Sequence, residues 1–414
     1  MVAVEPVSLR FVRPTWASEV ASPPHDALSA EERRRHLAEH PHSYLAVTRS
    51  AEDLAEEGWA DPAAEAVQVC REALDRLLAD DVFGPARPPA FYLYRLEEGG
   101  HTQTGLVCGV DTACYDAGMV RIHERVNQAR ASQLARHLRL VGAQSSPIAL
   151  AFRSAPAVRE IIGRVTATSP PFLDIDEGGL RQRLWAVDRP HDIATAVGAL
   201  SSLPVYLIDG HHRAAAASAD RREFGHDHHL MLSVLFPADE LRNQAFHRAL
   251  RGVDGQELVD RLSERFPVRE AAGPGDVVAR TADELALAVA PGSAAALEVG
   301  GRPRWLLVGL PAGDRGDIDP VRLSHHVLRP ILGIDESGAD PRLSYRPGPD
   351  DRDAVESLRV EPGEALFLMR PVPPSTLLAA SDRGEVMPPK STYFEPKARS
   401  GLFVRLIERD ITPG

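Results

Sequence analysis

The sequence predicts a mixed α+β protein with two domains. Segments with the apolar patterns of strands are interspersed with segments whose apolar residues recur every three or four positions, as in helices. The 414 residues exceed a single domain of roughly 100–200 residues. A stretch rich in glycine, proline and alanine at 271–296 offers a boundary. We therefore expect domains at 1–270 and 271–414.

The first domain contains turn and period signals that define its elements in order. A proline-rich turn at 21–26 separates a strand from a charged helix, and a turn with two glycines at 97–101 separates two apolar segments, which predicts a β-hairpin. The expected strands are 8–12, 90–96, 102–110, 119–122, 146–152, 202–209 and 228–236. The expected helices are 29–39, 61–80, 127–141, a segment directly after Gly210, and a segment through Phe246–Leu250.

The second domain has a shorter series of signals. We expect a hairpin at 296–310, a helix at 320–332, a strand at 365–372, a helix after 373–378 and a final strand at 401–407.

The overall composition restricts the class of protein. With 26% charged and 43% hydrophobic residues, and no apolar run near the ~20 residues of a membrane helix, the sequence predicts a globular protein without a membrane partner. A net charge of -12 argues against a general nucleic-acid binder, which concentrates basic residues. Three irregularly spaced cysteines and no secretory signal predict a reducing, cytoplasmic location and exclude a cysteine-rich zinc site.

The strongest local motif is Asp209-Gly210-His211-His212-Arg213, which follows an apolar strand and precedes four alanines. Glycine lets a ligand approach the backbone, and the new helix offers unpaired N–H groups and the positive end of its dipole. This pattern predicts an anion site suited to phosphate, with Arg213 as a further donor. The alternative is that Asp209 only caps the helix and the histidines lie on the surface.

A second motif places Glu124 between His123 and Arg125 at the end of a strand. The neighbouring positive charges would keep the carboxylate ionised, so it could act as a general base on a hydroxyl group. The alternative is a solvated charge cluster.

Histidines form a third feature. His226, His228 and His229, together with His211 and His212, make five histidines in nineteen positions. No recognised zinc spacing is present, so a structural role is favoured over metal binding.

Lysine usage gives a fourth feature. Lys390 and Lys397 are the only lysines among 47 basic residues, which codon bias towards arginine explains in general. Their retention within eight positions suggests that a compact ammonium is needed there. Lys390 and Lys397 are candidates to complete a nucleotide site across the domain interface or to bind a second anion; the alternative is a rigid structural loop.

Taken together, these motifs resemble one family. The order ASPPHD, FYLYR, QTGLV, HE, RH, GAQSSPI and DGHHRAAAA, followed by MPPKSTYFEPK, is similar to domain-of-unknown-function family one-thousand-and-fifteen, whose members are described as similar to free serine kinases. The resemblance implies a ParB/sulfiredoxin-like core at about 90–250 and an additional α+β C-terminal domain. This chain departs from the family at Val126, where threonine is usual, and at His25, where tyrosine is commoner.

The resemblance also implies an activity. We expect a kinase that transfers a phosphoryl group from ADP or ATP, with Mg²⁺, to free L-serine or a similar hydroxy amino acid. Glu124 matches the family's catalytic glutamate. Asp209 is the expected Mg²⁺ ligand, and the turn Gly210–Arg213, with His211 or His212 on a phosphate oxygen, is expected to hold the nucleotide.

Two other functions stay open. One is a nucleotide-binding regulatory module without turnover. The other is a metal-dependent hydrolase built on His211, His212, His226 and His228.

Overall fold

The computed structural model describes residues 2–25, 28–224, 229–290, 303–311, 318–335 and 340–407. It is an α+β protein made of two compact units. The first comprises Met1–Leu241 and Pro396–Gly414, and the second comprises Arg242–Glu395. The second unit is thus inserted into the first, and the units divide at Leu241–Arg242 instead of near residue 270.

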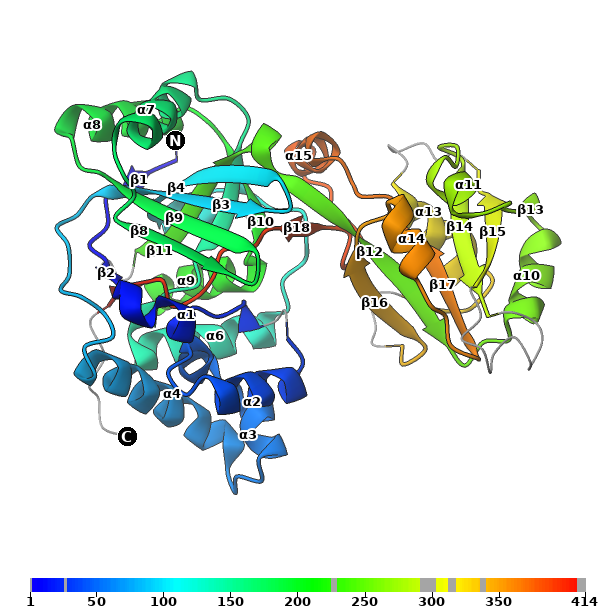
Figure 1. The fold of residues 1–414 in the computed structure, drawn as a ribbon, viewed down its shortest axis with the longest axis horizontal. Coiled ribbons are helices and arrows are strands. Elements are labelled where there is room, and N and C mark those ends of the chain that lie inside the picture. Colours follow the sequence, from blue (N-terminus) through cyan, green and yellow to red (C-terminus); the bar gives the residue numbers. More distant parts are fainter. Residues whose placement is uncertain are drawn as a thin grey trace. The chain divides into compact units, whose positions relative to one another are not determined.

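A nine-stranded mixed sheet forms the centre of the first unit (Figure 1). The strand order is β5-β10-β7-β11-β4-β3-β9-β8, with β1 paired to β4. The strands are β1 (Val4–Glu5), β3 (Phe91–Glu98), β4 (His101–Asp111), β5 (Val120–Arg121), β7 (Ile148–Phe152), β8 (Leu173–Glu177), β9 (Leu180–Val187), β10 (Val205–Asp209) and β11 (Leu230–Pro237). The predicted hairpin at 90–110 is confirmed as the antiparallel pair β3 and β4.

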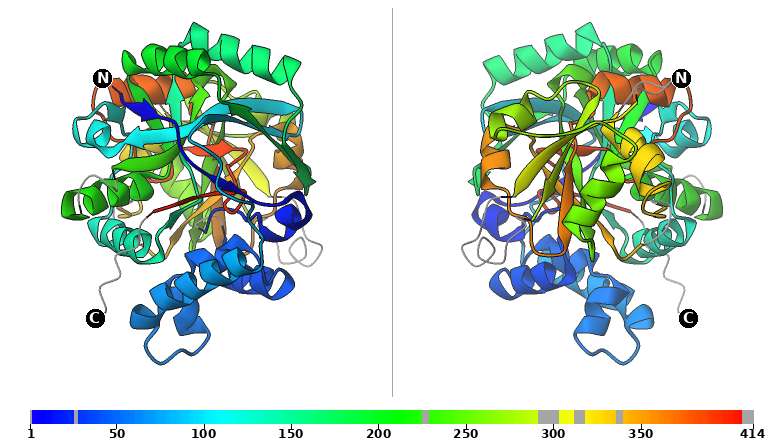
Figure 2. Two further views of the ribbon diagram at one scale, coloured as in Figure 1. Left: turned by 90° about the vertical axis from the view of Figure 1, so that its left-hand side faces the viewer. Right: turned by 90° about the vertical axis from the view of Figure 1, so that its right-hand side faces the viewer.

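Helices cover both sides of this sheet (Figure 1). The helices are α1 (Ala17–Val20), α2 (Ala30–Glu39), α3 (Ala51–Glu56), α4 (Pro62–Ala79), α5 (Thr112–Asp116), α6 (Gln128–Val141), α7 (Pro156–Thr168), α8 (Pro190–Ser201) and α9 (His211–Phe224). Figure 2 shows α7 and α8 at one end of the unit and α2 to α4 at the other. On α7, Val158, Ile161, Ile162 and Val165 recur at helical spacing and are all buried in the main core.

The C-terminal segment returns to the first unit. β19 (Phe403–Leu406) lies between β2 (Arg10–Phe11) and β6 (Ala143–Gln144) in a three-stranded sheet. The final strand expected in the C-terminal domain therefore belongs to the N-terminal unit, because its pairing partners are there.

The second unit is built on a seven-stranded sheet with a core on each face. Its strands are β12 (Arg242–Arg251), β13 (Val268–Glu270), β14 (Glu284–Val289), β15 (Arg304–Gly309), β16 (Leu343–Gly348), β17 (Glu364–Leu368) and β18 (Tyr393–Glu395). Its helices are α10 (Gly255–Ser263), α11 (Pro274–Val278), α13 (Asp319–Leu323), the π-helical turn η6 (Ser324–Leu328), α14 (Arg352–Ser357) and α15 (Pro374–Asp382).

The helix predicted through Phe246–Leu250 is wrong. This segment is part of β12, which pairs with β16 on one side and with β17 on the other. A central strand is buried on both faces, so its sequence lacks the alternation that identifies a strand. The second unit also begins earlier than the expected boundary near residue 270, because β12 is part of its sheet.

Two other expectations for the second unit need adjustment. The first strand of the hairpin at 296–310 lies largely outside the described residues, and β15 pairs instead with β14. The helix expected at 320–332 is divided into α13 and η6. No helix within the described ranges has the length and apolarity needed to cross a membrane.

Candidate active site at the ends of two parallel strands

The site begins where β5 and β10 end. These strands are parallel, and Val205 and Tyr206 pair with Val120 and Arg121. Their carboxyl ends therefore meet at one edge of the sheet, as is usual for ligand sites in α/β sheets. The residues that follow each strand, Glu124 and the turn at Gly210, are brought together by this pairing.

Gly210 connects β10 to α9 with a φ of +96°. A Cβ atom there would lie 3.1 Å from Cζ and Nη2 of Arg213. Glycine is thus required by the backbone and by the guanidinium that folds over it. This differs from the sequence-based reason, which was the approach of a ligand.

Asp209 is held by two cations. Lys397 Nζ donates to Oδ1 at 3.1 Å, and Nη2 of Arg213 donates to Oδ2. Burial alone would raise the pKa of Asp209, but the charges of Lys397 and Arg213 outweigh it and lower the pKa to about 2. Both carboxylate oxygens are therefore engaged by cations, and the expected role of Asp209 as a Mg²⁺ ligand stays a prediction.

Arg213 also has a structural role. Its Nη1 donates to the carbonyl oxygens of Ser146 and Pro147, both at 2.8 Å. With Nη2 on Asp209, both terminal nitrogens contact the protein. The side chain fastens the start of α9 to the segment before β7, and its expected role as a phosphate donor stays a prediction.

Two buried histidines and one carboxylate lie beside this turn. His123 is 2% exposed and His211 is 6% exposed, and their rings pack edge to face with centroids 4.5 Å apart. One ligand atom from each of His123, Glu124 and His211 lies within 4.8 Å of the others. Nε2 of His211 is buried and has no hydrogen-bond partner among the described residues.

Both imidazoles favour the neutral form. Burial lowers the pKa of His123 to about 4, although a hydrogen bond with the Leu207 backbone and the charge of Asp209 oppose this shift. Burial and the neighbouring His123 ring lower the pKa of His211 well below its usual value. Neutral rings retain a lone pair for a proton, a hydrogen bond or a metal ion.

His212 connects two helix starts. Its Nε2 accepts a hydrogen bond from the backbone N–H of Asn127 at 3.2 Å. Asn127 in turn caps α6 by accepting from the N–H of Arg130. His212 therefore holds the segment that carries Glu124 against α9.

Lys397 reaches Asp209 because its own segment is fixed. Nε2 of Gln103 donates to the carbonyl oxygen of Pro396 at 3.0 Å, and the N–H of Arg399 donates to the hydroxyl of Tyr94 at 3.2 Å. Both anchors lie on the central sheet of the first unit.

Lys390 belongs to the second unit. Its Nζ lies 5.3 Å from the ring centroid of Phe246, and its carbonyl oxygen accepts from Arg248. The first unit thus brings together Glu124, Asp209, Gly210, His211, His212 and Arg213, and Lys390 is not among these residues.

The hydrolase alternative rests on His211, His212, His226 and His228. His226 and His228 lie outside the described residues. His229 is paired with Glu5, with Nε2 and Oε1 3.5 Å apart. The histidine that packs against His211 is His123, which directly precedes Glu124 in the chain.

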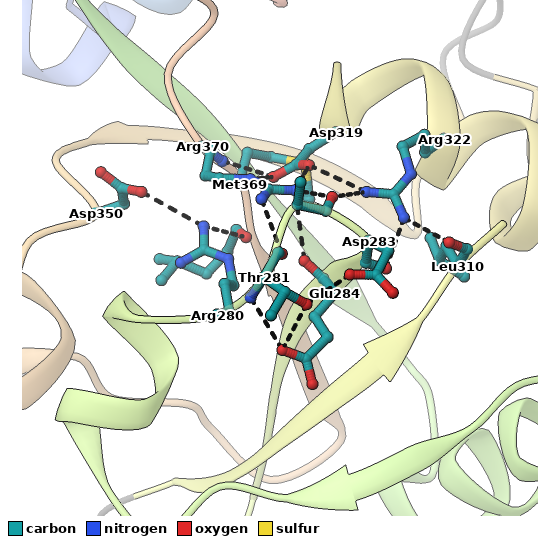
Figure 3. A network of polar contacts seen from close by, with 12 residues as sticks. Arg280, Thr281, Asp283, Glu284, Leu310, Asp319, Arg322, Asp350, Met369 and Arg370 are labelled. Carbon is teal, nitrogen blue, oxygen red and sulfur yellow. Dashed lines mark hydrogen bonds and ion pairs between the residues drawn. The ribbon is translucent and has the colours of Figure 1, made fainter. Parts of the chain in front are cut away.

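Polar residues also gather in the second unit, around a cavity of about 390 Å³. Asp319, Arg322 and Arg370 line it and bond mainly to one another and to backbone carbonyls (Figure 3). Because these charged groups are already engaged, this cavity is a weaker candidate site.

Comparison with known proteins gives the family. Residues 6–306 match the model of DUF1015, described as a protein of unknown function. The chain belongs to this family, as its motifs indicated. No curated protein matches the sequence.

Solved structures that match this chain include the following three. A glutamate-to-alanine variant of a free serine kinase in complex with ADP has 15% identity and a TM-score of 0.35, covering 72% of this chain and 92% of its own. SbnI from Staphylococcus aureus, truncated at its C-terminus, has 12% identity and a TM-score of 0.37, covering 72% and 85%. A conserved hypothetical protein from Pyrococcus furiosus has 14% identity and a TM-score of 0.34, covering 72% and 95%. Identities of 12–15% with TM-scores below 0.5 do not carry a function over to this chain.

Proposed function

We propose that this protein is a small-molecule kinase that transfers a phosphoryl group from ADP or ATP to the hydroxyl of free serine or a similar hydroxy amino acid. The observation that supports it is the convergence of Glu124 with the Gly210 turn, which follows from the parallel pairing of β5 and β10. A carboxylate and an amide-rich helix start are the two groups that this reaction needs side by side.

The donor phosphates would bind at the first turn of α9. The first N–H groups of a helix have no partner within it, and Ala214 is the first α9 residue to bond back, to the carbonyl of Gly210 at 2.9 Å. Lys397 adds positive charge at the same edge, beside Asp209. Phosphoryl transfer is catalysed mainly by such positioning and charge stabilisation.

Glu124 would act on the acceptor. In the transfer, the bond between the terminal phosphorus and its bridging oxygen breaks, and a new bond forms between that phosphorus and the serine oxygen. The hydroxyl proton passes to Glu124, and the nucleotide leaves one phosphate shorter. Asp209 acts as a positioning residue, because it holds Lys397 and Arg213 around the turn.

The direct test is a mass-spectrometric assay of the purified protein with serine or another hydroxy acid, ADP or ATP, and Mg²⁺. We expect a phosphorylated acceptor with the wild type and with Glu160→Gln, an exposed carboxylate of α7 used as control. Glu124→Gln should lose at least about 100-fold in rate, the scale of general base catalysis. Full activity of Glu124→Gln would exclude it as the base, and nucleotide binding without product would favour the regulatory module instead.

A further inference from the structure

The residues beside the turn have a second property, which concerns metal ions. We propose that His123, Glu124 and His211 form a binding site for one divalent transition-metal ion, of the class of Zn²⁺, Fe²⁺ or Mn²⁺. The inference deepens the proposed function. It rests on that function only in that both assign a role to the carboxyl ends of β5 and β10.

The geometry of the three side chains supports this site. Their ligand atoms lie within 4.8 Å of one another. Bonds of about 2.0–2.2 Å to nitrogen or oxygen place the ligands of one ion about 3–4 Å apart, so small side-chain rotations suffice. The three residues come from the ends of two paired strands, which fixes their backbones.

The surroundings of the histidines give independent support. Nε2 of His211 is buried without a hydrogen-bond partner among the described residues, which is costly for a polar atom unless something else satisfies it. His123 is oriented by a hydrogen bond with the Leu207 backbone. Ligating histidines are usually held through their other ring nitrogen in this way.

The donor set selects the metal. Mg²⁺ prefers oxygen ligands, whereas two imidazoles and one carboxylate suit Zn²⁺ and other divalent transition metals. Asp209, the expected Mg²⁺ ligand, accepts hydrogen bonds from Lys397 and Arg213. Three protein ligands leave open positions at the ion, where a substrate oxygen could bind and have its negative charge stabilised.

Metal binding can be measured without substrates. The purified full-length protein is stripped with a chelator and dialysed against Zn²⁺, and the bound metal is counted by elemental analysis. We expect the wild type to bind one more ion per chain than His211→Ala or Glu124→Gln, with an affinity on the order of 100-fold higher at that site. Co²⁺ loading should give visible absorption bands in the wild type that both variants lose.

Controls separate this site from other histidines and from misfolding. His191→Ala, at an exposed position of α8, and His228→Gln, from the alternative cluster, should bind as the wild type does. Glu124 is only half-buried, so Glu124→Gln is expected to keep the circular dichroism of the wild type even where His211→Ala unfolds. Equal Zn²⁺ binding by the wild type and a folded Glu124→Gln would overturn the proposal, as would displacement of Zn²⁺ by millimolar Mg²⁺.

The outcome is independent of kinase activity. A protein that binds Zn²⁺ but phosphorylates no acceptor would reject the proposed function and leave the metal site intact. A protein that makes product while binding no metal at His211 would do the reverse.

Discussion

Each unit contains a cluster of buried polar side chains, and the two clusters differ in what they leave unsatisfied. In the second unit, Asp319 accepts from Arg370 and is paired with Arg322, whose terminal nitrogens also donate to three backbone carbonyls (Figure 3). In the first unit, His211 keeps a buried ring nitrogen without a hydrogen-bond partner among the described residues. Among the described residues the second cluster also leaves Nε of Arg280 and Nε of Arg322 buried without a hydrogen-bond partner. These atoms can only donate, whereas a ring nitrogen of a neutral histidine can also accept a proton or bind a metal ion, so the open atom of the first cluster is the one that indicates a ligand site.

The largest expected effect is on the stability of the second unit. Asp319→Ala would leave the guanidiniums of Arg322 and Arg370 without their carboxylate, and Arg322 is only 2% exposed. Removing one partner of a buried ion pair costs about 3–5 kcal/mol. Hydrogen exchange with mass spectrometry should show faster exchange in β14 and β17.

The control for this variant is Asp283→Ala, since Asp283 lines the same cavity but is exposed, and its carboxylate accepts a hydrogen bond from the Thr281 hydroxyl. We expect a change within about 0.5 kcal/mol. If Asp319→Ala alters Zn²⁺ or nucleotide binding while leaving exchange unchanged, the assignment of this network to stability is wrong.

A second prediction concerns pH and His247, whose two ring nitrogens both have hydrogen-bond partners inside the second unit. Its Nδ1 accepts from the N–H of Met369, and its Nε2 bonds to the carbonyl of Pro349. Burial lowers the pKa of His247 to about 4. The unfolded chain, with a pKa near 6.5, therefore takes up the proton first as pH falls.

The stabilising effect of the neutral ring is present above about pH 6.5 and is lost as pH falls towards 4, with a total loss of about 3 kcal/mol. Urea unfolding between pH 7 and 4 measures it. His247→Gln should flatten this part of the pH profile. An unchanged slope in that variant would show that His247 does not titrate as described.

A third prediction concerns Lys397. Lys397→Met would leave the half-buried Asp209 with Arg213 alone, so the pKa of Asp209 should rise and the first unit should lose about 1–3 kcal/mol. If Lys397 also contacts phosphate, ADP affinity measured by calorimetry should fall as well.

The double variant Lys397→Met with Asp209→Asn separates these effects. It should recover part of the stability, because the uncompensated charge is gone, but it should not recover ADP affinity. Recovery of both would make the lysine a structural partner only.

The smallest expected effect is at Gly210. Gly210→Ala combines a φ of +96° with a close approach to Arg213, at a cost of about 1–2 kcal/mol. Gly100→Ala is a matched control, because φ is +77° and no atom lies within 4 Å of the added Cβ. Equal costs in thermal unfolding would show that contact with Arg213 contributes nothing.

The sequence was informative where signals are local. The hairpin β3–β4 and the strand, glycine and helix at Asp209–His211 were predicted because turns and helix starts depend on neighbouring residues. β12 was missed, since burial on both faces removes its alternation.

The partners within the site could not be predicted in the same way. His123 meets His211 only because β5 and β10 are neighbours, and Lys397 reaches Asp209 from 188 positions away in the chain. For the contact between His123 and His211, the available signal was a histidine at a strand end beside Glu124. For the contact between Lys397 and Asp209, the signal was the rarity of lysine.

The insertion of the second unit has a consequence for biosynthesis. Because Lys397 and β19 follow the inserted unit, a ribosome must translate the whole of that unit before the first unit has these parts. Arg242 and Glu395 are paired across two antiparallel strands, so Leu241 and Pro396, which flank the inserted unit, lie close together. A short engineered loop between Leu241 and Pro396 could therefore replace the inserted unit. A gene shortened in this way would still encode Lys397 and β19, whereas one ending at the inserted unit would not.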